Sequence, residues 1–308
     1  MNVSSANTSA CLNPNRSFRL LAALTTLSCF GLKAPAEPQI PSSTTPDKNE
    51  YSLFHPTPDS LMRPFATDRP DKTESPYTVD AGHFQFEMDL LNYSYDRYSY
   101  GPGNFRNESI SIGPLNMKVG LCNTADLQLV IQPYNHFRTH DLTSGAVQNQ
   151  SGFGDLITRL KVNLWGNDGG TTAFGVMPFL KLPTNQHHLG NNSLEGGLIL
   201  PLWVELPQGW EMGLMAEVDL NVDASGSGYH AEYIHSIAFS HGIIGKLSGY
   251  AEFFSALSAE VHSPWVTTVD FGFTYLLTEN VQLDAGINLG ITRSADDLNP
   301  FTGISVRF

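Results

Sequence analysis

The sequence has few charged residues, few cysteines and no apolar run long enough to cross a membrane as a helix. Charged residues make up 15% of its 308 residues, against about 25% in an average soluble domain. The three cysteines are too few for a disulfide framework or a cysteine-rich metal site. The formal charge of −13 at pH 7 argues against a nucleic-acid partner. A strand with lipid on one face and water on the other produces such a low charge density, because only every second residue can be polar.

The first 36 residues have the pattern of a cleaved secretory signal peptide. Arg16 and Arg19 precede the apolar run 20–32, and residues 34–36 follow as an A-x-A cleavage pattern. The run is shorter than the roughly 20 residues that a membrane-spanning helix needs. The alternative is a buried amphipathic helix, but the run lacks its 3.6-residue period. Cleavage after residue 36 removes three positive charges and no negative one, which makes the formal charge −16 and leaves Cys122 as the single cysteine.

Proline density divides the rest of the chain. Residues 35–76 contain nine of the nineteen prolines, and proline is excluded from helix interiors and central strands. We therefore predict a proline-rich periplasmic linker over residues 37–78 and a barrel domain over residues 79–308. Residues 67–76 carry alternating charges, and we expect them to lie beneath the barrel as an ordinary lead-in to the first strand. The alternative is a plug that docks among charges inside the barrel.

From Gly82 onward, apolar and polar residues alternate. In the run 280–292, the apolar side chains from Val281 to Ile291 occupy every second position, and Gln282, Asp284 and Asn288 lie between them. Because side chains alternate across a strand, one face is apolar and the other polar. Most such runs are long enough to cross a bilayer at a tilt. They predict twelve strands, over residues 83–97, 108–121, 125–137, 153–165, 171–182, 194–206, 210–222, 229–240, 246–256, 264–277, 280–292 and 300–308.

The connections between these strands alternate in length. Those after every even-numbered strand are short, such as residues 207–209, and most of the others are longer, such as residues 182–193. Short periplasmic turns and long outer loops are typical of outer-membrane barrels. Aromatic residues near strand ends, Trp203 and Trp210 among them, suit the girdles at the membrane interfaces. The prediction is an all-β fold, an antiparallel transmembrane β-barrel of about 12 strands in the outer membrane; a soluble barrel or sandwich is the alternative.

The last six residues, GISVRF, predict how such a barrel closes. Each unpaired backbone group in hydrocarbon costs several kcal/mol, so the final strand must pair with the first. Ile304, Val306 and Phe308 are then expected to face lipid. Ser305 and Arg307 face inward, because an arginine on the lipid face at mid-membrane costs about 2 to 4 kcal/mol. We expect Phe308 to be the signal for the barrel assembly machinery, which with outer-membrane lipid is a predicted partner.

Short motifs around the start of the first and fourth predicted strands resemble a known family. They lie in the stretches 66–90 and 152–166, and the runs 174–184 and 297–308 support them. The residues that carry the resemblance are Arg69, Pro70, Gly82, Glu87, Gly152, Gly154 and Asp155. Together these stretches resemble the bacterial outer-membrane family labelled “Putative MetA-pathway of phenol degradation”, whose members are commonly called transporters. The resemblance implies a channel for small molecules, aromatic ones among them.

If the polar strand faces point inward, the charges of the lumen are segregated. The basic residues are Lys118, Arg159, Lys161 and Lys181, and the acidic residues are Glu205, Glu211, Glu217, Asp219, Glu232, Glu252, Asp270 and Asp284. In a closed barrel the two sets would face each other across the lumen, and such a transverse field discriminates solutes by charge. The alternative is a set of local salt bridges that fill a closed lumen.

Nothing in the sequence points to catalysis or to a cofactor. It contains no Gly-x-Ser-x-Gly and no His-Glu-x-x-His motif. His235 and Ser236 are adjacent, so they point to opposite strand faces. His187 and His188 lie in an expected outer loop without further ligands, so no metal site is expected. The expected function is passive passage of small solutes; a barrel with a closed structural or binding lumen, and an outer-membrane lipid hydrolase, are the alternatives.

Overall fold

The computed structural model describes residues 47–97, 104–187, 189–260 and 263–308, so the expected signal peptide lies outside the described residues. Two single-turn 3-10 segments, η1 (Asp59–Leu61) and η2 (Pro207–Gly209), accompany the strands. Among the described residues, no helix has both the length and the apolar character needed to cross a membrane. The described strands are β1 (Phe84–Asp96), β2 (Phe105–Ile112), β3 (Leu115–Cys122), β4 (Ala125–Ile131), β5 (Tyr134–Asp141), β6 (Val147–Gly152), β7 (Leu156–Trp165), β8 (Thr172–Leu182), β9 (Glu195–Glu205), β10 (Trp210–Val222), β11 (Tyr229–Ile244), β12 (Leu247–Ser258), β13 (Val266–Thr278), β14 (Val281–Gly290) and β15 (Leu298–Arg307).

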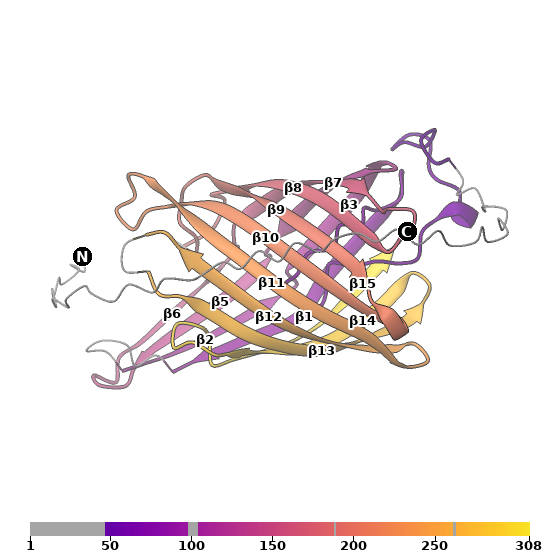
Figure 1. The fold of residues 1–308 in the computed structure, drawn as a ribbon. Coiled ribbons are helices and arrows are strands. Elements are labelled where there is room, and N and C mark those ends of the chain that lie inside the picture. The colour runs from indigo at the N-terminus through magenta and orange to yellow at the C-terminus, as the bar shows by residue number, and fades with distance from the viewer. Residues whose placement is uncertain (1–46, 98–103, 188, 261–262) are drawn as a thin grey trace, which may run out of the picture. The chain divides into compact units, whose positions relative to one another are not determined.

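These strands form one closed antiparallel barrel (Figure 1). From β7 to β15 each strand pairs with the next, β4 and β3 continue the wall from β7, and β1 closes it between β3 and β15. Twelve strands therefore make the circuit. β2, β5 and β6 prolong β3, β4 and β7 toward one rim, because each of these three barrel strands is interrupted once. The prediction of twelve antiparallel strands is confirmed.

The three interruptions lie at neighbouring positions of the wall, at residues 113–114, 132–133 and 153–155. Two of them contain a proline, which has no N–H to donate to the ladder. The backbone still pairs there, since the Gly154 N–H donates to the Gln132 carbonyl at 2.9 Å. The wall therefore continues past the interruptions into β2, β5 and β6.

Strand β6 was not predicted. Its sequence, VQNQSG, has polar residues at adjacent positions, so it lacks the alternation that marked the other strands. It pairs with β5 from Asn135 opposite Gly152 to His140 opposite Val147. Its residues are all exposed or half-buried. The backbone ladder, not an apolar face, accounts for this strand.

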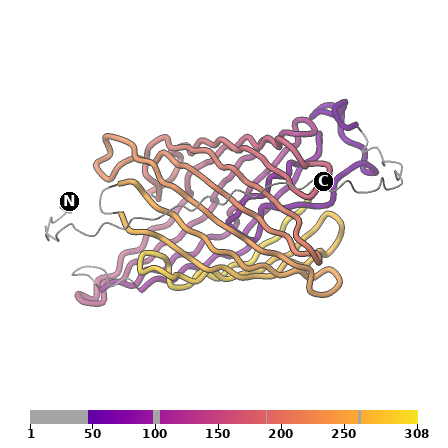
Figure 2. The backbone as a smooth tube through the Cα atoms, viewed as in Figure 1, coloured from indigo at the N-terminus to yellow at the C-terminus, as the bar shows by residue number. Residues whose placement is uncertain are grey.

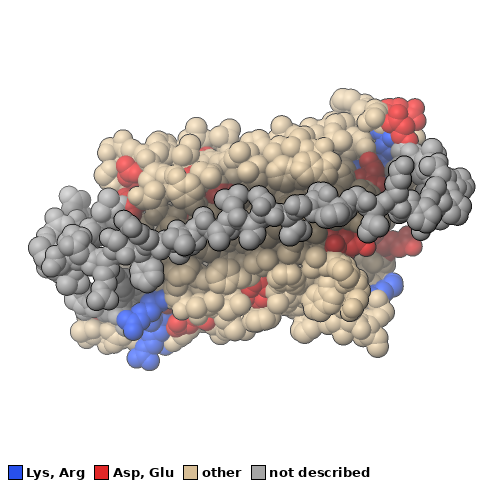
Figure 3. Space-filling model, viewed as in Figure 1, with Lys and Arg blue, Asp and Glu red and all other residues tan. Residues whose placement is uncertain are grey.

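The outer surface of the barrel is apolar and its inner face is polar. On β13, Phe271, Phe273 and Tyr275 are 44%, 56% and 45% exposed, whereas Asp270 and Thr268 on the opposite face are buried. Uncharged side chains cover most of the wall shown in Figure 3, and Lys and Arg lie at its two ends. This is the alternation that lipid outside and water inside require of a barrel.

The C-terminal strand closes the barrel in the predicted register. Gln85 lies opposite Arg307, and the backbones of Phe84 and Phe308 exchange hydrogen bonds of 2.8 and 3.2 Å. Ser305 and Arg307 are buried, and Phe308 is 68% exposed. The prediction that alternate residues of GISVRF face inward and outward is confirmed.

The two rims differ as predicted. At one rim the connections are short, over residues 123–124, 166–171, 206–209, 245–246 and 279–280. At the other rim they are mostly longer, over residues 97–104, 142–146, 183–194, 223–228, 259–265 and 291–297. The C-terminus lies at the rim of short turns, as Figure 2 shows. We call these ends the short-turn rim and the long-loop rim.

Candidate functional site

Residues 63–81, which we call the plug, lie inside the barrel before the chain enters β1. They contact inward-facing side chains on opposite sides of the lumen, such as Lys118 on β3 and Asp270 on β13. The indigo trace in Figure 2 follows this segment from the short-turn rim into the barrel. This corrects the expectation that residues 67–76 form a lead-in beneath the barrel. The physical reason is charge pairing with the inner wall.

Two acidic side chains of the plug face the basic part of the wall. The Asp68 carboxylate forms ion pairs with Lys118 and with Lys161, whose Nζ lies 2.6 Å from Asp68 Oδ1. Glu74 accepts a hydrogen bond from Arg159 Nη1 at 2.6 Å. Lys118, Lys161 and Asp68 are all buried. The plug thus supplies negative charge that pairs with Lys118, Arg159 and Lys161 on the wall.

Two basic side chains of the plug face the acidic part of the wall. The Arg69 guanidinium binds Asp284 through two hydrogen bonds, 2.7 Å from Nη2 and 3.1 Å from Nε, and it also pairs with Asp89. Lys72 Nζ lies 3.1 Å from Asp270 Oδ2, and the Lys72 N–H donates to Glu252 at 2.9 Å. A two-point arginine–carboxylate contact fixes orientation as well as position.

The charge order of the plug therefore matches the two charged walls. From the sequence, we expected these walls to face each other across the lumen. In the region that the plug occupies they are separated, because Asp68 and Glu74 meet the basic wall while Arg69 and Lys72 meet the acidic wall. Buried ion pairs add little net stability, yet removing one partner costs about 3 to 5 kcal/mol. Such pairs specify where the plug sits.

Two wall glycines give the plug room. A Cβ placed on Gly303 would overlap the Arg69 guanidinium, and one on Gly120 would overlap the backbone carbonyl of Asp80. Both glycines lie on the inner face of the barrel, opposite Asp284 and Asp126 in the strand register. The wall is therefore shaped to the plug, because any larger residue at these positions would displace it.

Uncharged groups also hold the plug. The Thr73 and Ser236 hydroxyl oxygens are 2.6 Å apart, and the Thr73 hydroxyl donates to Glu252 at 2.6 Å. Asn163 donates from its amide to the Pro76 carbonyl at 2.9 Å. An apolar cluster of buried wall side chains, Met177, Ile199 and Met215, lies on β8, β9 and β10. The plug is fixed by directional contacts on several strands.

A group of ion pairs at the short-turn rim ties down both ends of the plug. Arg63 and Asp80, near its two ends, form an ion pair of 3.3 Å, and Lys48 lies 2.8 Å from Asp168. Burial disfavours the ionised form of Asp168. Hydrogen bonds from Lys48 and Asn123 and the charge of Arg63 outweigh this and hold the pKa of the Asp168 carboxyl below its usual range. This carboxylate is therefore ionised at neutral pH.

Farther toward the long-loop rim, the predicted lumen residues are arranged differently. Lys181 pairs locally with Glu195 across β8 and β9 at 2.7 Å, and Glu195 was not among the predicted lumen residues. Glu217 and Asp219 are half-buried on the inner face of β10. Among the described residues, no lysine or arginine lies within ion-pair distance of Asp219. Among the described residues the same holds for Glu217, so two neighbouring acidic side chains of β10 lack a local basic partner.

The residues of the family resemblance lie in two places. One place is the plug and the start of β1: Arg69 and Pro70 belong to the plug, Gly82 follows it and Glu87 lies in β1. The other is the interruption between β6 and β7, with Gly152, Gly154 and Asp155. Glu87 accepts the Asp68 N–H at 3.1 Å and pairs with Lys118. Asp155 accepts the Asn185 N–H at 3.1 Å, which anchors the connection 183–194. The motifs thus position the plug and one outer loop.

A cavity of about 900 Å³ separates the plug from the wall on the side of β9 to β13. Tyr77 of the plug, Trp203 and Tyr250 line it together with the acidic residues Asp71 and Glu211. The Tyr77 and Trp203 rings meet edge to face with centroids 5.7 Å apart. Trp203 therefore lies inside, which corrects its assignment to an outer girdle. Its place in β9 alone could not distinguish the two faces, because apolar residues occupy both sides of that strand.

Both the sequence and the barrel have counterparts among known proteins. A family model described as “Putative MetA-pathway of phenol degradation” matches residues 67–308. Among solved structures, the NanC porin aligns with TM-score 0.45 and 10% identity over 71% of this chain and 98% of that one. A deletion mutant of the TodX monoaromatic hydrocarbon channel aligns with TM-score 0.39 and 8% identity, over 73% of this chain and 88% of that one. An anion-selective porin from Comamonas acidovorans aligns with TM-score 0.36 and 7% identity, over 73% of this chain and 98% of that one.

These structural likenesses are too weak to carry an inference about function. Among curated proteins, none matches this chain. The family match, by contrast, runs from the plug residue Thr67 to the C-terminal Phe308 and covers most of the sequence. The chain belongs to the family described as “Putative MetA-pathway of phenol degradation”.

Proposed function

We propose that this protein is an outer-membrane channel for the passive passage of small solutes, aromatic ones among them, and that it has no catalytic role. Support comes from a closed barrel with an apolar exterior and a polar interior. In this proposal outer-membrane lipid surrounds the wall, the barrel assembly machinery inserts it, and the short-turn rim is periplasmic. The plug narrows the periplasmic half of the lumen.

The observation that carries the proposal is the cavity beside the plug. It has about 900 Å³ of space, and ligand sites for small molecules have about 300 to 1,000 Å³. Tyr77, Trp203 and Tyr250 offer ring faces and edges there, and the charged lining includes acidic side chains such as Glu211 and basic ones such as Arg63. A small aromatic solute fits this lining, whose charged side chains are of both signs.

The plug itself favours a second candidate, a barrel whose lumen stays closed. Its ion pairs with Lys161, Arg159 and Asp284 join opposite walls. In such a barrel the plug would be a permanent part of the core and the cavity a pocket without an exit. The two candidates differ in one measurable property, which is ion current through the folded protein.

The test is conductance of the refolded full-length protein in planar bilayers. We expect small channel events from the wild type and larger or more frequent events from Asp68→Asn, in which the plug loses its contact with Lys161. Complete absence of events from both proteins would favour the closed barrel. Swelling of proteoliposomes in phenol and in a sugar of similar size then tests the preference for aromatic solutes.

Location is tested separately. We expect the protein in the outer-membrane fraction of a Gram-negative cell, and we expect heating to change its gel mobility as a barrel unfolds. A protein that stays soluble without detergent and shows no such change would contradict the membrane assignment.

A further inference from the structure

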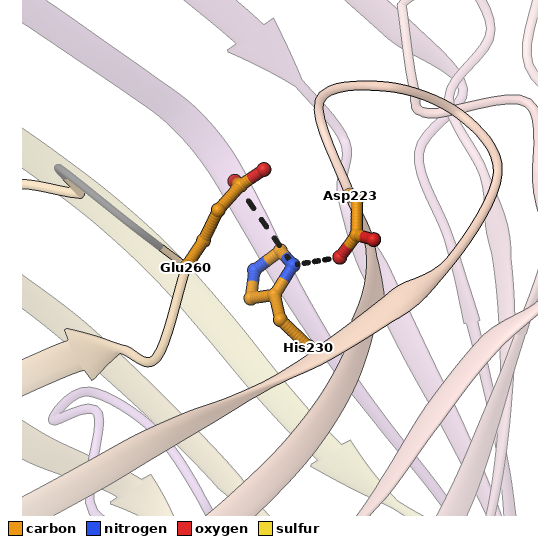
Figure 4. A group of neighbouring side chains, drawn as sticks. All are labelled: Asp223, His230 and Glu260. Atoms are coloured by element: carbon orange, nitrogen blue, oxygen red, sulfur yellow. Dashed lines mark hydrogen bonds and ion pairs between the residues drawn. The ribbon is translucent and has the colours of Figure 1, made fainter.

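Three ionisable side chains converge at the long-loop rim, away from the plug (Figure 4). Asp223 directly follows β10, His230 lies in β11 and Glu260 follows β12. His230 Nδ1 is 3.2 Å from Asp223 Oδ1 and 4.0 Å from Glu260 Oε2. One ligand atom from each residue lies within 4.8 Å of the other two. Sequence spacing gave no sign of this group, because Glu260 is thirty residues from His230.

One backbone hydrogen bond holds the Glu260 side chain, and another closes the turn that carries Asp223. The Ala224 N–H donates to Glu260 Oε1 at 2.8 Å, which leaves Oε2 directed at His230. The turn from Asp223 to Gly228 is closed by the Asp223 N–H, which donates to the Gly228 carbonyl at 2.9 Å. The arrangement is therefore fixed by the backbones of two adjacent connections and does not depend on the imidazole alone.

The charges of the group are not balanced by protein side chains. A neutral imidazole has one N–H, so its Nδ1 can satisfy only one of the two carboxylates. Among the described residues, His230 is the only basic side chain within 4.0 Å of Asp223 or Glu260. Glu232, on the same strand face as His230, adds further negative charge. The two carboxylates are about 30% exposed, which leaves them open to an ion from water.

We propose that Asp223, His230 and Glu260 bind a Zn²⁺ ion at the long-loop rim. One imidazole nitrogen and two carboxylate oxygens are a donor set that zinc accepts, with bonds of about 2.0 to 2.2 Å. Ligand atoms around a tetrahedral ion at these distances lie about 3.3 to 3.6 Å apart, so Glu260 has to move closer to His230, from which its Oε2 is now 4.0 Å away. Three protein ligands leave the fourth position to water.

The ion links two connections that no strand pairing joins. Asp223 begins the connection 223–228, and Glu260 lies in the connection 259–265, one hairpin farther along the wall. Bound zinc holds them together across β11, beside the mouth of the lumen. The inference does not depend on the channel function, since the site lies outside the cavity next to the plug.

The test is titration of the detergent-solubilised, chelator-treated full-length protein with ZnCl₂ in a calorimeter. We expect one equivalent to bind, and we expect at least a tenfold weaker affinity in His230→Ala and in Asp223→Asn. His140→Ala, at the same rim on β5, is the matched control and should bind like the wild type. Heat-dependent gel mobility confirms that each variant is folded.

Cobalt gives a second measurement. A tetrahedral site with one nitrogen and three oxygen ligands gives Co²⁺ a visible absorption band, which should be present in the wild type and lost in His230→Ala. No zinc binding, or equal affinity in the wild type, His230→Ala and Asp223→Asn, would overturn the proposal and leave an imidazole–carboxylate hydrogen bond only.

Discussion

Asp68→Asn is the substitution that separates the plug from the basic wall with the least change of shape. The Asp68 carboxylate is the single ion-pair partner of Lys161 among the described residues, and both side chains are buried. Loss of one partner from a buried pair costs about 3 to 5 kcal/mol. At 1.36 kcal/mol per factor of ten, the equilibrium between docked and displaced plug shifts by roughly 10² to 10⁴.

Two assays report that shift. We expect the open probability in planar bilayers to rise until it saturates, and trypsin to cleave within residues 63–81 at a protease concentration that leaves the wild type intact. Asp141→Asn, at the end of β5 on the long-loop rim and far from the plug, is the control and should change neither result. Adding Lys161→Met to Asp68→Asn removes the stranded charge and should restore docking. Unchanged current and unchanged protease resistance in Asp68→Asn would refute the reasoning.

Three other substitutions test separate parts of the structure. Gly303→Val should displace the Arg69 guanidinium, because overpacking makes the docked plug about 1 to 3 kcal/mol less favourable, and tryptic cleavage of the plug should increase. Gly242→Val, with open space around it, should not increase cleavage. Equal cleavage of the two variants would count against a wall shaped to the plug. Asp219→Asn should lower the cation preference measured by reversal potentials in a KCl gradient more than Asp270→Asn does, because Lys72 already compensates Asp270; the opposite ranking would be inconsistent with the docked plug. Phe308→Ser should reduce the folded protein recovered from outer membranes, whereas Phe54→Ser, 93% exposed, should leave it unchanged; equal yields would remove the role of Phe308 in assembly.

The barrel could be predicted because the alternation of apolar and polar residues can be recognised within each strand by itself. Lipid outside and water inside impose alternation on every strand, so the faces of Asp284, Ser305 and Arg307 followed from their position parity alone. The need to pair every backbone group then joined the last strand to the first. Strand β6 was missed for the same reason, because its ladder forms without an apolar face.

The plug could not be predicted, because its evidence is not local. Charges such as Asp68 and Arg69 suit a solvated linker as well as a buried segment. Their partners are far away in sequence, since Lys161 is 93 residues from Asp68 and Asp284 is 215 residues from Arg69. The segregation of charge on the wall was visible in the sequence. The charges of the plug could be recognised as its partners only in the folded barrel, where both walls surround the plug.

The central claim is that residues 63–81 lie inside the barrel, and a cross-link tests it most directly. The Thr73 and Ser236 hydroxyl oxygens are 2.6 Å apart, so cysteines at both positions, with Cys122→Ser, should form a disulfide in intact outer membranes under mild oxidation. Thr73→Cys with Ser144→Cys, at the long-loop rim, is the matched control pair and should not react. A cross-link confined to the first pair is the predicted result. Its absence, with both cysteines present and the barrel folded, would contradict the plugged lumen.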